Sequence, residues 1–277
     1  MTELPRLTQA RCETMREIQV LDGGTEPRSL WIPIERPLTL FVDKHELVTL
    51  MTLGQHPEWL ALGYLLNQRL IDDVREIESV TVDWEVGAAA LRTRRGIERL
   101  RERTAQRIVT TGCGQGTVFG AAMADLGQRA LPPVQASRFD RASLQAALET
   151  MRQQPSVHRQ AGSVHGTALF QGAQMLFFVE DVGRHNAVDT VAGWMAMHGL
   201  HGRSGADKLL CTTGRLTSEM VMKAALLGIP VLASRNGATA MGIDLAQSLG
   251  MTLIGRASGG PGRRFIVYLG AERLIGA

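Results

Sequence analysis

One cysteine of the chain lies where a nucleophilic thiol would be expected. Cys113 stands within residues 111–116, TGCGQG, and has a glycine on each side. Glycines remove steric cover and leave the backbone free to move, so we predict an exposed thiol on a pliable loop. Its reactive form is the thiolate, which nearby guanidinium groups stabilise. Arginines are frequent from Arg92 to Arg107, although a solvated helix face explains that run equally well. A small residue in a tight turn remains the alternative interpretation of Cys113.

The other two cysteines do not suggest a second reactive site. Cys211 lies in the apolar run LLC and suits a small buried side chain, and Cys12 has no recognisable setting. The sequence contains no C-x-x-C pair and no cysteine–histidine cluster at ligand spacing. Structural zinc and a dithiol redox centre are therefore disfavoured, and we predict no metal site.

A second candidate is a polar segment between an apolar strand and a helix. Residues 180–186, EDVGRHN, include Asp181, Arg184 and His185. Buried polar side chains need a ligand or a hydrogen-bond network, and a helix start offers free N–H groups to an anion. A purely structural network is the alternative. His165, in the run SVHGTAL, is by itself more typical of a hydrogen-bonded strand histidine.

A third candidate is a glycine-rich run with three arginines, GRASGGPGRR at residues 255–264. Backbone amides approach a ligand closely where side chains are missing, and guanidinium groups neutralise phosphate charge. The run matches neither GxxxxGK[ST] nor GxGxxG, so a flexible hairpin loop explains it equally well. Its candidate ligand-binding residues are Arg256, Ala257, Ser258, Gly259, Gly260, Pro261, Gly262 and Arg263.

The elements that must position these residues are clearest after residue 134. A helix over FDRASLQAALETMRQQ, with Asp140 as its N-cap, precedes two paired strands, VHGTALF and QMLFFVE. Helices and strands then alternate to the C-terminus, which predicts a mostly parallel sheet with helices on its faces. Ligands of such sheets bind at the carboxyl ends of the strands. The candidate residues at 181–185 and 256–263 fall there.

The first half of the chain predicts a smaller domain of mixed α+β type. Strand patterns occupy 31–53 and 78–86, and Pro57 begins a helix between them. Leu131-Pro132-Pro133 is the best linker candidate. We therefore predict a polar, loosely held arm at 1–28, an α+β domain at 29–133 that ends in the Cys113 loop, and an α/β domain at 134–277.

Composition excludes several classes of partner. The 277 residues are 44% hydrophobic and 21% charged, and the formal net charge is only +3, so charge alone does not nominate nucleic acid. No apolar run approaches the length of about 20 residues that a membrane-spanning helix needs. The N-terminus lacks the apolar core of a secretory signal, and three cysteines do not make a disulfide framework. We predict a cytoplasmic protein.

The motifs together resemble the FdhD family of formate dehydrogenase accessory sulfurtransferases, in order from about Trp31 to the C-terminus. The resemblance is carried by EWLALGYLL, TTGCG, SVHGTAL, EDVGRHNAVD, TTGRLTSEMVMKAALLGIPVLAS, and TLIG followed by the glycine/arginine loop and VY. It implies a cytidine-deaminase-like α/β fold for the C-terminal half, and a homodimer. Deamination itself is not implied, because neither H-x-E nor P-C-x-x-C is present.

The resemblance also implies a chemistry. Family members accept sulfur from a cysteine desulfurase as a cysteine persulfide, and pass it to a molybdenum or tungsten bis-guanine-dinucleotide cofactor for formate dehydrogenase. Cys113 matches the persulfide cysteine, and residues 256–264 match the segment assigned to that cofactor, which a guanine nucleotide would mimic. His165, Asp181, Arg184 and His185 match family positions whose role in cofactor binding we infer from their chemistry.

Departures from the family pattern leave alternatives open. Gly116 replaces a second cysteine that many members carry, Asn67-Gln68-Arg69 replaces a Ser-Glu-Gly run, and the loop RNGATAM lacks a common proline. A relay between two cysteines is excluded here. One alternative is a cofactor chaperone in which Cys113 carries no sulfur. Another is an enzyme that converts free guanine nucleotides. The metal, the desulfurase and the recipient dehydrogenase are not specified by the sequence.

Overall fold

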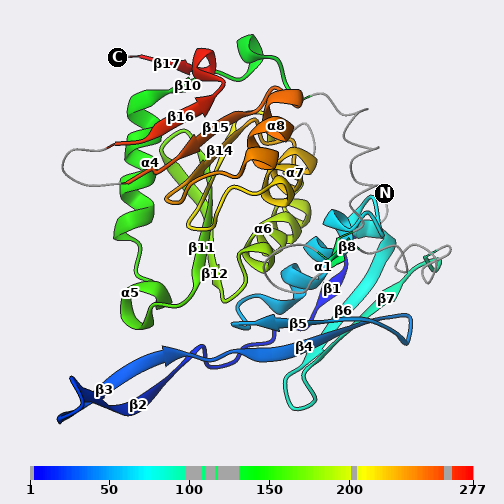
Figure 1. Cartoon of the computed structure of the whole chain (residues 1–277). Helices are drawn as coiled ribbons and strands as arrows, with labels where there is room; N and C mark the ends of the chain where they lie inside the picture. The colour runs from blue at the N-terminus through cyan, green and yellow to red at the C-terminus, as the bar shows by residue number, and fades with distance from the viewer. Residues whose placement is uncertain are drawn as a thin grey trace.

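The computed structural model describes residues 3–97, 131–200, 205–258 and 264–276, and the backbone of 108–109 and 116–117. It is a mixed α/β structure in which each half of the chain builds its own main sheet (Figure 1). The general α/β class predicted from the sequence is confirmed. The cytidine-deaminase-like arrangement and the domain boundaries stay predictions.

The first half folds as a five-stranded sheet packed against one helix. The strand order is β1-β6-β7-β4-β5, and alternate residues such as Leu38, Leu40 and Val42 are buried. Pro57 opens the helix as predicted, since it lacks the N–H that a first helical position leaves unpaired. The bounds are β1 Arg6–Leu7, β4 Arg36–Val42, β5 His45–Thr52, α1 Pro57–Asn67, η1 Val74–Glu76, β6 Ile77–Asp83 and β7 Ala88–Thr93.

The loosely held arm predicted for residues 1–28 differs from what the structure shows. Strands β2, Met15–Asp22, and β3, Glu26–Pro33, form an antiparallel hairpin that projects from the body (Figure 1). Gly23 and Gly24 both have positive φ, at 57° and 86°. Two consecutive left-handed residues give the turn that matches the twist of paired strands. The adjacent glycines were therefore a hairpin signal.

The predicted sulfur-carrying residue, Cys113, lies outside the described residues. The backbone on either side of it is described at β8, Ile108–Val109, and β9, Gly116–Thr117. These short strands pair antiparallel, with Val109 opposite Gly116.

The second half builds a six-stranded sheet in the order β12-β11-β13-β14-β15-β16. The only parallel pairs in this sheet are β13 with β14 and β14 with β15. The sheet is therefore mixed, and not mostly parallel as predicted. The antiparallel pairs are β11 with β12, β11 with β13, and β15 with β16. The strands are β11 His165–Gln171, β12 Gln174–Asp181, β13 Lys208–Thr212, β14 Val231–Ser234, β15 Thr252–Gly255 and β16 Ile266–Leu269.

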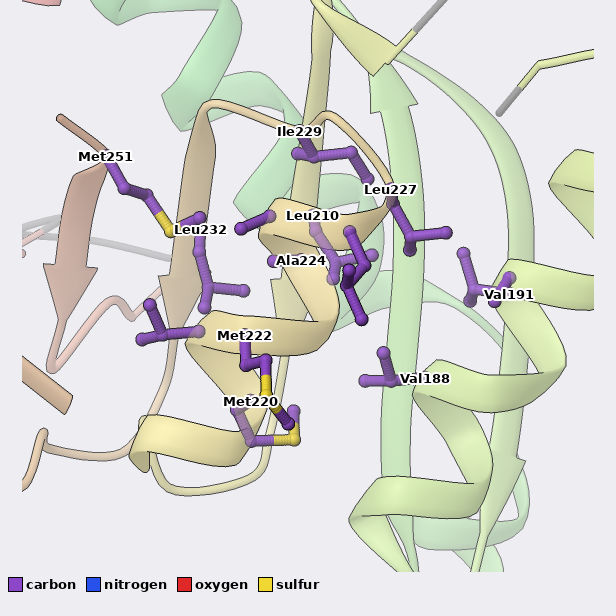
Figure 2. Close-up of a cluster of buried hydrophobic side chains, with 14 of the residues drawn as sticks. Val188, Val191, Leu210, Met220, Met222, Ala224, Leu227, Ile229, Leu232 and Met251 are labelled. Atoms are coloured by element: carbon purple, nitrogen blue, oxygen red, sulfur yellow. The ribbon is translucent and has the colours of Figure 1, made fainter. Parts of the chain in front are cut away.

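Helices cover both faces of this sheet (Figure 1). On one face α6, Arg184–Met197, α7, Ser218–Leu226, and α8, Ala240–Ser248, bury an aliphatic and methionine-rich core. Figure 2 shows part of it, where Val188 and Val191 of α6 approach α7 and the strands. On the other face lie α4, Arg141–Gln153, and α5, Val157–Ala161. Asp140 caps α4 as predicted, accepting from Ser143 N at 2.7 Å. The remaining elements are η2 Val134–Ala136, β10 Phe139–Asp140, η4 Ala271–Arg273 and β17 Leu274–Ile275.

The two halves meet where α1 crosses α6. A methyl group at Gly63 of α1 would lie 1.7 Å from the carbonyl oxygen of Asp189, and one at Gly193 of α6 would lie 2.0 Å from that of Trp59. Both distances are far below van der Waals contact. The two helix backbones therefore touch directly, and only glycine fits at either position.

Candidate functional site

The sheet of the second half brings most of the described candidate residues to one edge. Strands β13 and β14 end there, β12 ends there, and β11 begins there because it runs antiparallel to β13. His165 is the register partner of Asp181. Backbone bonds tie the loops together, since Arg256 N donates to Asn236 O at 3.0 Å and Ala257 N to Ser234 O at 2.9 Å.

Three helices start at this same edge, directly after the strands that precede them. Helix α6 begins at Arg184, α7 at Ser218 and α8 at Ala240. Unpaired N–H groups and the positive end of each helix dipole therefore gather on one side of the sheet. This arrangement favours a negatively charged ligand.

Two of the predicted arginines take different positions at the edge. The side chain of Arg184 is buried and crosses Gly214, where a methyl group would lie 2.9 Å from Arg184 Cβ. Arg256 is exposed, adopts a left-handed backbone with φ 52°, and places its guanidinium beside Gly237. Arg256 is thus the accessible cation, while Arg184 lies beneath the surface.

The loop that follows Arg256 is closed at its base. Ser258 N donates to Arg264 O at 3.1 Å, so the two ends of the glycine-rich run are held together. Ala257 is buried and Ser258 is exposed. The other predicted members of this run lie outside the described residues; they are Gly259, Gly260, Pro261, Gly262 and Arg263.

His165 is half-buried at the start of β11. Its Nδ1 lies 3.5 Å from Thr213 Oγ1. Burial, followed by the nearby charge of Arg184, lowers the pKa of this imidazole below its ordinary value. His165 is therefore neutral near pH 7, and is suited to exchange a hydrogen bond with a ligand and not to neutralise a phosphate.

His185 belongs to a buried polar cluster between α6 and α7. It is 1% exposed, its Nε2 lies 3.4 Å from Glu219 Oε2, and neither ring nitrogen makes a hydrogen bond with a described residue. Burial and the charge of Lys223 lower the pKa of His185 to about 2, so the ring is neutral. Lys223 Nζ continues the cluster, 2.9 Å from Asp189 Oδ2.

The cluster extends to the first half of the chain, since Asn67 Nδ2 donates to Asp189 Oδ1 at 2.6 Å. The sequence reading did not single out Glu219, Lys223 or Asp189. A signal was present, because Glu219 and Lys223 stand four residues apart in one helix. The residues between them, MVM, and those after them, AALL, are apolar. Two opposite charges on a helix face that must be buried indicate an internal ion pair.

Asp181 is a second link between the halves. Its carboxylate is 1% exposed and accepts hydrogen bonds from Leu53 N at 3.1 Å, Gly183 N at 2.9 Å and Asn186 Nδ2 at 2.9 Å, as well as from the hydroxyl of Thr52. Burial raises the pKa of Asp181 to about 6, against the effect of these donors. In this structure the carboxylate holds the end of β5 against the start of α6.

The basic run before Cys113 is only partly described. Arg92 Nε pairs with Glu78 Oε2 at 3.0 Å, and Arg94 donates to the carbonyl oxygens of Arg75 and Glu3. Those two guanidinium groups are thus engaged on the sheet of the first half. The arginines from 99 to 107, and any approach of theirs to the thiol, lie outside the described residues.

Within the described residues we find neither a cluster of metal ligands nor a membrane-spanning helix. No three histidine, cysteine, aspartate or glutamate side chains are grouped in a way that would hold a metal ion. No helix in the same part of the chain has the length and apolar character needed to cross a membrane.

Comparison with known proteins decides the family. The FdhD/NarQ family model matches residues 33–275. This chain belongs to the FdhD/NarQ family. It is 30% identical over 240 residues to the sulfur carrier protein FdhD of Bacillus subtilis, covering 87% of this chain and 88% of that protein. It is 27% identical over 277 residues to the sulfur carrier protein FdhD of Halalkalibacterium halodurans, covering 97% of each.

A solved structure is also similar. A protein from Desulfotalea psychrophila, described as a formate dehydrogenase accessory protein, superposes with a TM-score of 0.72 at 25% identity. The match covers 94% of this chain and 98% of that one. The fold described here is thus similar to that of a solved formate dehydrogenase accessory protein.

Proposed function

We propose that this chain carries sulfur to the cofactor of a formate dehydrogenase. A cysteine desulfurase would supply the sulfur, Cys113 would hold it as a persulfide, and a molybdenum or tungsten bis-guanine-dinucleotide cofactor would receive it. One observation carries the proposal. The chain belongs to a family whose relatives are named sulfur carriers, and three helix starts and Arg256 lie together at the sheet edge where the predicted cofactor segment begins. We also expect a cytoplasmic homodimer.

The chemistry of loading is that of thiol exchange. The Cys113 thiolate attacks the outer sulfur of the donor persulfide, and a new S–S bond forms while the donor's S–S bond breaks. The donor cysteine leaves as a thiolate, and Cys113 becomes a persulfide without a net oxidant. In delivery the S–S bond of the Cys113 persulfide breaks, the outer sulfur passes to the substrate cofactor as sulfane sulfur, and Cys113 leaves as a thiolate.

The residues at the sheet edge would hold the cofactor while it is sulfurated. Arg256 and the helix starts suit its phosphates, because guanidinium and backbone N–H groups bind phosphate oxygens well. Neutral His165 supplies a hydrogen bond beside them. His185 and Asp181 are buried, so we assign them to positioning α6 and not to contact with the ligand.

Mass spectrometry tests the loading step. Wild-type protein mixed with a desulfurase and cysteine should gain the mass of one sulfur atom, and Cys113→Ala should gain none. Cys12→Ala is the matched control, because it removes a half-buried thiol elsewhere in the chain, and it should load like wild type. An unchanged wild-type mass, or an equal gain in Cys113→Ala, contradicts the proposal.

The chaperone alternative is separated by complementation. If the protein only holds and inserts the cofactor, Cys113→Ala still restores formate dehydrogenase activity to a cell that lacks this protein. If Cys113 carries sulfur, the variant does not restore it. Turnover of free guanine nucleotides by the purified chain would favour the enzyme alternative.

A further inference from the structure

A pocket of about 430 Å³ opens in the first half of the chain, at the start of α1. Residues of the segment 7–14, which leads from β1 to β2, form one wall, and residues of the segment 54–59 form the other. Gln55 of the second wall accepts from Glu180 N of β12 at 3.0 Å, so the pocket lies beside the junction of the two halves. A cavity of this size suits a small organic ligand.

A buried carboxylate faces this pocket from the first turn of α1. Glu58 is 4% exposed and lines the pocket. Its Oε1 accepts from Ala10 N at 2.6 Å, which fixes the side chain, and its Oε2 receives no hydrogen bond within the described part of the chain. The second oxygen is therefore open to a donor from a ligand. A cationic ammonium group would be a strong one, because a hydrogen bond between two charged groups is about twice as strong as a neutral one.

Positive groups line the same pocket. Arg11 is exposed, and its guanidinium makes no hydrogen bond or ion pair with a described residue. Helix α1 has 11 residues and begins without a side-chain cap, which leaves the N–H groups of Glu58 and Trp59 free in its first turn. Loss of water at the ring, followed by the charge of Arg11, lowers the pKa of His56, so this imidazole is neutral near pH 7. Arg11 and the helix start therefore suit a carboxylate.

The rest of the pocket has an apolar wall. The Trp59 indole stacks on the His56 ring with centroids 4.5 Å apart, and the Phe177 ring of β12 meets the indole edge-on at 5.4 Å. Burial raises the pKa of the Cys12 thiol, which therefore stays protonated and lines the pocket as a small apolar group. Leu7 lies beside them. These groups suit a side chain that is apolar or carries sulfur.

We propose that this pocket binds a free α-amino acid whose side chain is apolar or carries sulfur. The ammonium group binds Glu58, the carboxylate binds Arg11 and the start of α1, and the side chain packs on Trp59. Two opposite charges in one pocket match the two charges of an α-amino acid, whereas a peptide terminus carries only one of them. The site lies in the first half of the chain, apart from the sheet edge of the second half to which the proposed function assigns the cofactor.

Calorimetric titration of the full-length chain with L-methionine tests the proposal. N-acetyl-L-methionine lacks the ammonium charge and L-methioninamide lacks the carboxylate, so each should bind about 10-fold more weakly or worse. The amide also stands for the first residue of a peptide, so its weak binding separates a free amino acid from a peptide terminus. L-glutamine has a polar side chain of similar length and should bind more weakly as well.

Variants show whether the two charges act as proposed. Glu58→Gln keeps an oxygen that accepts from Ala10 N but loses the charge, so L-methionine should bind about 10-fold more weakly and its advantage over N-acetyl-L-methionine should disappear. Arg11→Gln should remove the advantage over L-methioninamide in the same way. A role of Glu58 in folding alone would not change which analogue binds better. Glu46→Gln and Arg16→Gln are the matched controls, exposed residues of β5 and β2, and should leave binding unchanged.

Three results would overturn the assignment. They are an absence of L-methionine binding to wild type, binding of either blocked analogue or of L-glutamine as tight as that of L-methionine, and unchanged preferences in both variants. Arg11 is exposed, so Arg11→Gln tests the match of charges even where Glu58→Gln fails to fold.

Discussion

Asp181 sits among four hydrogen-bond donors and yet has a raised pKa. The donors stabilise the ionised carboxylate. Loss of water from a group that is 1% exposed destabilises the ionised form by more than the donors stabilise it. The folded protein therefore holds a proton on Asp181 at pH values where the unfolded chain has released it. Because the same carboxylate joins β5 to α6, its ionisation bears on how firmly the two halves are held.

We predict that Asp181 makes stability fall as pH rises from 5 to 7.5. Its folded pKa is about 6 and its ordinary value is 3.8, so its contribution is full below about pH 4 and is lost as pH rises through 6. The loss between pH 5 and pH 7.5 is about 1.4 kcal/mol. Urea unfolding of wild type and Asp181→Asn at both pH values measures it, because the variant cannot titrate. A wild-type advantage that stays constant or grows with pH contradicts the prediction.

At the residue scale the sequence indicated exposed polar side chains better than the distant partners of the buried ones. Arg256 could be found from a glycine-rich run, whereas Cys113, singled out by its flanking glycines and a family motif, lies outside the described residues and its role stays a prediction. Asp181 and His185 were found by type, but Thr52, which donates to Asp181, and Lys223, whose charge lowers the pKa of His185, are distant in sequence. No local pattern shows that partnership. Their assignment as ligands remains a prediction, and the structure supports a positioning role.

The crossing of α1 and α6 depends on two glycines at the element scale. Gly63 and Gly193 let the two backbones touch, because each faces a carbonyl oxygen of the other helix. Asn67 and Asp189 form their hydrogen bond across the same interface. A wider separation of the helices would therefore disturb both the packing and the buried polar cluster that supports His185.

We predict that Gly63→Ala lowers the free energy of unfolding by about 3 kcal/mol or more. The added methyl group would lie 1.7 Å from Asp189 O and would force the helices apart. Gly172→Ala is the control: that turn glycine has open space around it and φ 56°, so the same change costs only about 1 kcal/mol of backbone strain. Denaturant unfolding gives both values. Equal costs would show that the helices do not cross this closely.

Elements with a strong local signal were predicted, and others were not. Helices α1 and α4 follow from Pro57 and from the Asp140 cap, and the alternating elements of the second half appear in order. Strand β7 was missed, because its run AAALRT begins with three alanines and has no β-branched or aromatic residue before its last position, Thr93. It becomes a strand by pairing with β6 on one side and β4 on the other. Pairing with neighbouring strands, and not local propensity, therefore makes this run a strand.

At the scale of the whole molecule the two sheets are joined by a continuous set of buried contacts. Ala196 of α6 is buried within the core of the first half, and Leu53, after β5, packs with Val157 and Val164 of the second half. The hydrogen bonds of Asp181 and Asp189 cross the same boundary. Each half therefore covers apolar side chains of the other, and neither half would bury its whole core alone.

We predict that residues 134–277 do not fold alone into the state they adopt in the full chain. Without α1, the face of α6 that carries Gly193 and Ala196 is exposed, and Asp189 loses its bond from Asn67 while it remains paired with Lys223. Exposed apolar surface together with a partly satisfied buried charge lowers the free energy of unfolding by several kcal/mol. That is a large share of the total free energy of unfolding of a domain. Amide hydrogen exchange compares α6 in the fragment and in the full chain. Fast exchange throughout α6 of the fragment, with slow exchange restored on adding residues 1–133, is the expected result; equal protection in the isolated fragment would mean that the halves are independent domains.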